Sequence, residues 1–142
     1  FLNLDAVLNN TIIGKSIVKE LNELNKTNSK NLEVEREKIK KKEQDLINKK
    51  NILSKDEFDT LLSKLKKEID TFNKNKNIEI MKYEELKKKE LDNFIRRITP
   101  LIENYTVTNS ISLVVNQKNI FIGSKKYDIT SDIINLVDNN LK

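Results

Sequence analysis

Apolar residues recur at intervals of three, four, seven or eight residues along two stretches of this chain, with charged and amide residues between them. The first series consists of Ile17, Leu21, Leu24, Leu32, Ile39, Leu46 and Leu53. The second series consists of Phe58, Leu62, Leu65, Ile69, Phe72, Ile80, Tyr83, Leu91, Phe94 and Ile98. Such spacing places each series on one face of an α-helix. The sequence therefore predicts two long helices that pair along a narrow seam.

The two series are separated by a short polar break. Ser54 and Glu57 have the spacing of a capping box, which begins a new helix. A break here would fold the second helix back on the first. We therefore predict that residues 15–105 form an antiparallel helical hairpin, a coiled-coil arm with its tip near residues 53–57.

The predicted seam is interrupted. Four polar residues fall at seam positions: Asn28, Glu35, Lys42 and Lys49. The interval from Phe72 to Ile80 also departs from a seven-residue repeat, and such a departure locally unwinds a coiled coil. Two interpretations stay open: a solvated arm with an imperfect seam, or an arm kept loose so that it can flex around a partner.

Short apolar segments flank the arm at both ends. Residues 1–4, 111–115 and 120–122 have the composition of strands, the last two forming a hairpin. Short helices are predicted at residues 6–9 and 131–141. Gly14 would reorient the chain before the first long helix, and the second should end by Thr106. The fold class is thus α+β, with residues 1–14 and 106–142 forming a small β-rich head.

The head would contain only about fifty residues and no cysteine. A unit of this size buries too little surface to be stable alone without a disulfide or a metal. We therefore expect an obligate oligomer, whose number of subunits this argument leaves open. Its shared core is predicted to use Leu4, Ile111, Leu113, Val115, Ile120 and Ile122.

Composition argues against catalysis. The chain has neither cysteine nor histidine, so it lacks thiol nucleophiles, imidazole bases and the usual transition-metal ligands. With two glycines it has no glycine-rich phosphate loop. We therefore predict no enzyme activity, no cofactor and no metal site.

The chain is moderately basic, with 27 lysines and arginines against 22 acidic residues and a net charge of +5. Acidic residues are interleaved throughout and no recognition motif is present, so specific nucleic-acid binding is not expected. An anionic or membrane-destined partner suits this surface, including an anionic lipid or lipopolysaccharide surface. Because the chain begins at Phe1 rather than Met, we expect a removed upstream segment, for which a secretory signal is one candidate.

Both ends of the chain resemble the Skp/OmpH family of periplasmic chaperones. The matching segments are residues 2–8, 14–15, 111–115 and 127–133, and the layout of elements is similar over the whole chain. The resemblance implies a homotrimer whose heads form a β-barrel-like body and whose arms enclose a cavity. It also implies an ATP-independent holdase that keeps unfolded outer-membrane proteins soluble in the periplasm.

A holdase needs weak contacts at many points, and the arm offers apolar and cationic side chains for them. The predicted client-contacting residues are Val34, Ile47, Ile52, Leu61, Ile78, Met81 and Leu86, with Lys49, Lys50, Lys66 and Lys67. The alternative for the apolar set is local packing within the arm. The alternative for the whole chain is a structural coiled-coil spacer or stalk protein, in which the head oligomerises and the arms only span distance.

Overall fold

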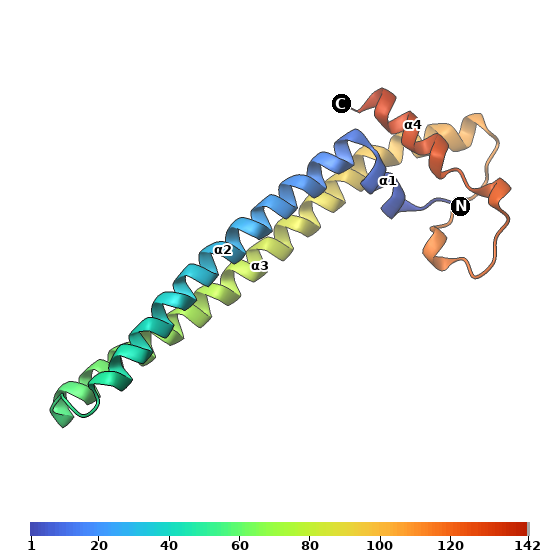
Figure 1. The fold of residues 1–142 in the computed structure, drawn as a ribbon. Helices are drawn as coiled ribbons and strands as arrows, with labels where there is room; N and C mark the ends of the chain where they lie inside the picture. Colours follow the sequence, from blue (N-terminus) through green and yellow to red (C-terminus); the bar gives the residue numbers. More distant parts are fainter. Residues whose placement is uncertain (142) are drawn as a thin grey trace. The chain divides into compact units, whose positions relative to one another are not determined.

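The structure, a computed structural model, describes residues 1–141 and is built mainly of helices. Its α-helices are α1 (Leu4–Asn10), α2 (Ile12–Lys49), α3 (Lys55–Thr108) and α4 (Thr130–Asn140) (Figure 1). Two short 3₁₀ helices, η1 (Gln117–Asn119) and η2 (Lys125–Tyr127), lie between α3 and α4. The chain divides into two compact units, to which α2 and α3 both contribute. Unit 1 comprises Phe1–Asn22 with Leu86–Lys142, and unit 2 comprises Glu23–Glu85.

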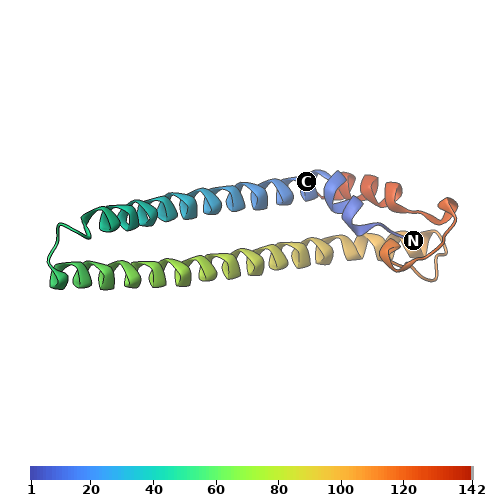
Figure 2. The same cartoon turned by 60° about the horizontal axis from the view of Figure 1, so that its bottom comes forward.

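Unit 2 is an antiparallel pair of helices, with the end of α2 joined to the start of α3 by a short turn (Figures 1 and 2). The predicted capping box is confirmed. Ser54 donates to Glu57 Oε2 from its hydroxyl at 2.7 Å and its backbone N–H at 3.1 Å, while the Glu57 N–H donates to Ser54 Oγ at 3.4 Å. These bonds hold the pKa of Glu57 below its usual value and fix the point at which α3 begins.

The seam of unit 2 is formed by apolar residues of both predicted series. Leu46 and Leu65 are buried on facing helices, and Ile39 and Phe72 line the same groove. Half-buried apolar residues extend the seam: Leu24, Leu32, Leu62 and Ile69. The predicted helical hairpin is therefore confirmed within this unit.

The predicted seam is wrong at Ile80, which does not lie on the face that packs against the other helix. Ile80 is 48% exposed, whereas Glu79 and Tyr83 are half-buried. The seven-residue repeat continues unbroken from Phe72 to position 79 and on to Leu86, which is also half-buried. Leu86, which was predicted to contact clients, thus lies on the seam face.

The core of unit 1 forms where α1, α3 and α4 meet. Its fully buried side chains are Val7, Ile98, Ile133 and Val137, and Phe94 packs in the same cluster. Ile133 and Val137 are four residues apart, so both project from one face of α4. Burial of this face explains why the short C-terminal segment is helical.

The junction of α1 and α2 differs from expectation, because α2 begins at Ile12 rather than at residue 15. The first N–H of α2 donates to Asp138 Oδ1 of α4 at 2.7 Å. The buried hydroxyl of Thr11 donates to the Val7 carbonyl at 2.8 Å and accepts from the Gly14 N–H at 3.2 Å. Gly14 is therefore a helical residue of α2, and the chain reorients at Thr11 instead.

The predicted strands are not formed in the single chain. Within residues 1–141 there is no β-sheet, only one isolated parallel bridge between Leu2 and Asn116. Residues 111–115 are irregular rather than strand, residues 120–122 follow the 3₁₀ helix η1, and Leu4 starts α1 with Asn3 as its N-cap. In the described chain the backbone N–H groups of residues 112–115 have no hydrogen-bond acceptor. A strand is completed only by a partner strand, and one chain does not supply it.

The ends of the last two helices lie within two residues of their predicted positions. α3 runs to Thr108 rather than stopping by Thr106, and the Ile111 N–H then donates to the Thr106 carbonyl at 2.9 Å. This bond, with the positive φ of 55° at Ser110, makes a Schellman motif that ends the helix. α4 begins at Thr130, one residue before the predicted start at residue 131.

Candidate binding surfaces

Unit 2 exposes apolar side chains that do not lie on its seam. Six of the predicted client-contacting residues are exposed: Val34, Ile47, Ile52, Leu61, Ile78 and Met81. Ile52, in the turn, is the most open of them at 80%. The seventh, Leu86, is half-buried and belongs to unit 1. Unit 2 therefore presents exposed apolar side chains outside its seam.

The predicted lysines of the same surface are also exposed: Lys49, Lys50, Lys66 and Lys67. In the described chain none of these four forms an ion pair. By contrast, the seam lysine Lys42 bridges the two helices, with its Nζ 2.7 Å from Glu68 Oε2. A polar seam position is thus satisfied by a partner on the facing helix, whereas the exposed lysines are open to an anionic ligand.

Unit 1 contains an apolar cleft of about 450 Å³. Its lining is Leu2, Leu4, Ile95, Ile98, Thr99, Ile102, Glu103, Thr106, Ile111, Ser112, Leu113, Val114 and Asn116. Three residues predicted for the shared core, Leu4, Ile111 and Leu113, meet here. The other three, Val115, Ile120 and Ile122, do not line it. Sequence reasoning missed the contribution of α3 because it assigned Ile98 to the helical seam.

Several large apolar side chains of unit 1, the cleft residue Leu113 among them, are strongly exposed in the single chain. They are Val107, Leu113, Phe121, Ile122 and Tyr127, with Phe121 open to 98%. A small monomeric unit rarely exposes so much apolar surface, and such surface is typical of protein contacts. Unit 1 therefore presents surface that a partner would cover.

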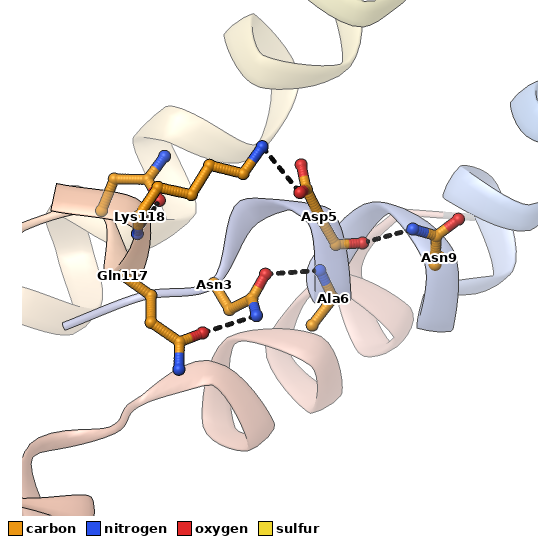
Figure 3. A network of polar contacts seen from close by, with 7 residues as sticks. Asn3, Asp5, Ala6, Asn9, Gln117 and Lys118 are labelled. Atoms are coloured by element: carbon orange, nitrogen blue, oxygen red, sulfur yellow. Dashed lines mark hydrogen bonds and ion pairs between the residues drawn. The ribbon is translucent and has the colours of Figure 1, made fainter. Parts of the chain in front are cut away.

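A polar network fixes the segment that leads out of the cleft (Figure 3). The Asn3 side chain accepts from the Ala6 N–H at 2.9 Å and donates to Gln117 Oε1. Lys118 Nζ lies 2.7 Å from Asp5 Oδ2. The ion pair is exposed and contributes little by itself. Together these contacts hold η1 against the start of α1.

A second network joins the N-terminus to α4. Asp128 Oδ1 accepts from both the backbone N–H and the hydroxyl of Thr130, and Thr130 Oγ1 accepts from the Asn3 N–H at 3.0 Å. The Thr130 hydroxyl bond holds the pKa of Asp128 below its usual value. Because an ionised carboxylate is the better acceptor, this arrangement anchors α4 at neutral pH.

The described residues contain neither a metal-binding cluster nor a membrane-spanning helix. Among them no set of three or more histidine, cysteine or acidic side chains is placed to hold a metal ion. No helix within residues 1–141 is long and apolar enough to cross a membrane. What unit 1 and unit 2 provide is an open apolar cleft and a set of scattered apolar and cationic contacts.

Residues 1–137 match the profile of a protein family described as outer membrane protein (OmpH-like). The crystal structure of an OmpH-like candidate outer membrane chaperone from Caulobacter crescentus CB15 superposes with a TM-score of 0.83. The two sequences are 15% identical, and the match covers 96% of this chain and 80% of the other. No curated protein matches the chain in sequence. The structural similarity shows that the fold is shared.

Proposed function

The chain belongs to the OmpH-like outer membrane protein family, and from this premise we propose that it is an ATP-independent holdase chaperone of the periplasm. Its clients are unfolded outer-membrane β-barrel proteins, which it keeps soluble until they reach the membrane. The role uses neither catalysis nor a cofactor, and it requires no specific nucleic acid.

The observation that carries this proposal is the surface of unit 2. The six exposed apolar side chains that were predicted to contact clients lie along one helical hairpin, together with unpaired lysines. Each contact is weak, because a single apolar side chain buries little area and an exposed ion pair is worth at most about 1 kcal/mol. Many such contacts hold an unfolded chain that lacks a defined shape, and their weakness permits release without nucleotide.

The same proposal includes a homotrimer assembled through a head of residues 1–14 and 106–142, with residues 15–105 as the arm. Two features of unit 1 support assembly: the apolar cleft beside the exposed Leu113, and the backbone N–H groups of residues 112–115, which have no acceptor among the described residues. An extended segment with free N–H and C=O groups readily pairs with another strand. Three copies would complete one another's sheets and surround a cavity lined by their arms.

The test is an aggregation assay. A denatured outer-membrane β-barrel protein is diluted into buffer with and without this protein, and light scattering follows aggregation in the absence of nucleotide. We expect suppression at a ratio near one trimer per client, and weaker binding at high salt because ions screen the lysines. Failure to protect any such client would contradict the proposal.

The alternative function is a coiled-coil spacer or stalk subunit. Its support is the well-formed hairpin, with Leu46 and Leu65 buried and Lys42 paired with Glu68. A spacer needs arm length but no exposed apolar contacts. An anionic lipid or lipopolysaccharide surface is a further partner class for the lysines, and vesicle binding by the protein would test it.

A further inference from the structure

The excess positive charge of the chain lies in one segment. Residues 38–67, around the reversal between α2 and α3, contain ten lysines and five carboxylates. The rest of the chain contains equal numbers of basic and acidic residues. The net charge of +5 is therefore a property of this segment alone, and an acidic ligand would be attracted to it.

A groove of about 270 Å³ lies in this segment between α2 and α3. It is lined by Lys42, Asp45, Leu46, Lys49, Leu61, Lys64, Leu65 and Glu68. Leu46 and Leu65 are buried and form its base, while Leu61 is 40% exposed at its wall. The groove thus offers an apolar surface of the size of one large side chain.

The rim of the groove is cationic. Lys42 is neutralised by Glu68 at 2.7 Å. Lys49 and Lys64, in contrast, form no ion pair with any described residue, and Asp45 is the one remaining carboxylate of the lining. A ligand that brings carboxylates to Lys49 and Lys64 would find both ammonium groups unpaired.

We propose that this groove is a subsite for segments of unfolded polypeptide in which an apolar side chain is flanked by aspartate or glutamate. The inference rests on the proposed holdase function and names the part of a client that unit 2 selects. The apolar side chain covers Leu46, Leu61 and Leu65, and its flanking carboxylates pair with the two free lysines. Basic segments are disfavoured by the same lysines.

The geometry favours a peptide over a lipid surface. A membrane presents a continuous layer of negative charge, which would approach Asp45 and Glu68 as well as the lysines. A peptide can place its carboxylates at Lys49 and Lys64 only. The apolar base is also a recess between helices, which admits one side chain but not a flat interface.

The experiment measures fluorescence anisotropy of two labelled peptides binding to the full-length protein. Both peptides carry the same Leu-Phe core, flanked by glutamates in one and by lysines in the other. We expect the glutamate peptide to bind at least about fivefold more tightly, which corresponds to one exposed ion pair. The double variant Lys49→Gln/Lys64→Gln should lose this preference, and Leu61→Ala should weaken both peptides.

A matched control removes two charges elsewhere in unit 2. Lys74→Gln/Lys76→Gln changes exposed lysines that lie outside the groove, and it should keep the preference within about twofold. Ile80→Ala is the corresponding control for Leu61→Ala. Equal binding of the two peptides, or equal losses in both double variants, would overturn the subsite.

Two further readouts separate the possible failures. Binding of phosphatidylglycerol vesicles is titrated in parallel. If Lys49→Gln/Lys64→Gln abolishes vesicle binding but leaves the peptide preference intact, the two lysines bind a lipid and the proposal is wrong. The aggregation assay is run with the same preparation. Protection of a client without peptide preference refutes the subsite alone, whereas absence of protection refutes the holdase function.

Discussion

Gly14 lies so close to Leu8 that a side chain cannot be added to it. A Cβ at position 14 would stand 1.9 Å from the Leu8 carbonyl oxygen and 2.7 Å from Thr11 Oγ1. The oxygen belongs to the backbone of α1, so it cannot move aside without displacing that helix. We expect Gly14→Ala to destabilise unit 1 by about 1–3 kcal/mol or more, as overpacking of a tight contact does, in urea denaturation followed by circular dichroism.

Gly123→Ala is the control for this substitution. Its added Cβ would meet side-chain atoms of Ile120 and Phe1 at 3.2 and 3.3 Å, and these side chains can rotate away. We expect its free energy of unfolding to stay within about 0.5 kcal/mol of the unsubstituted protein, the usual range for surface changes. Equal effects of the two substitutions would show that the contact with Leu8 is not what requires glycine.

The Tyr105 hydroxyl donates to Asp132 Oδ2 at 2.6 Å and ties α3 to α4. This hydrogen bond, with partial burial and the nearby negative charge, raises the pKa of Tyr105 above its usual value. A raised folded-state pKa means that the stabilisation is complete below the unfolded-state pKa, about 10. It is then lost as the pH rises through the folded-state value.

Tyr105→Phe should therefore cost about 1 kcal/mol at pH 7, the worth of an ordinary hydrogen bond. The difference between the two proteins should shrink above pH 10, where the unfolded tyrosine ionises. Urea denaturation at pH 7 and pH 11 measures it. Deprotonation of lysines affects both proteins alike and cancels in the difference. A difference that stays constant with pH would show that the Asp132 bond does not contribute.

A substitution at Leu113 tests the stability of the assembly separately from that of the single chain. It is 76% exposed in the single chain, so Leu113→Asp leaves the new carboxylate in water and should preserve helicity by circular dichroism. If a neighbouring copy covers Leu113, the same charge is buried without a partner at a cost of several kcal/mol. We expect the mass measured by light scattering to fall from about three times the 16.6 kDa chain mass to that of a single chain.

Ser131→Asp adds an equal charge at an exposed position in the first turn of α4 and should leave the mass unchanged. If Leu113→Asp keeps the trimer mass, Leu113 lies outside the interface. If the unsubstituted protein is itself a stable monomer at micromolar concentration, the proposed assembly is wrong.

Local signals in the sequence predicted the elements that were confirmed. Ser54 and Glu57 form their capping box between residues three positions apart, and no distant group is needed. Ile39 and Phe72 meet because two helices joined by a short turn pair their positions symmetrically about it. The predicted seam was wrong at Ile80, because the prediction followed apolar residues alone. The seven-residue repeat instead places the polar residue Glu79 on the seam face.

Features that depend on distant residues could not be predicted. The β-branched segment at residues 111–115 favours an extended chain, but a sheet also requires a partner, and within residues 1–141 the pairing stops at the bridge between Leu2 and Asn116. The requirement for glycine at position 14 comes from the path of α1, which no local pattern reveals. The cleft of unit 1 likewise joins α3, Leu2 and residues 111–114, which are far apart in the chain.

Shortening the arm distinguishes a holdase from a spacer. Ile39 and Phe72 line one groove, and Lys42 reaches Glu68 one turn nearer the tip, so positions 39 and 72 lie at one level of the hairpin. Removing residues 39–72 and joining Lys38 to Asn73 by a short glycine-containing turn shortens both helices together. The buried residues of unit 1, including Phe94 and Ile98, are untouched.

We expect the shortened protein to keep its trimer mass and to lose protection of clients in the aggregation assay, because the arms no longer enclose a deep cavity. A full-length variant with Ile47→Gln, Ile52→Gln and Leu61→Gln tests contacts separately from length. It retains the arm but removes three exposed apolar side chains, and it should protect only in part. If the shortened protein protects as well as the full-length one, the arms act as spacers and the holdase function must be assigned elsewhere in the chain.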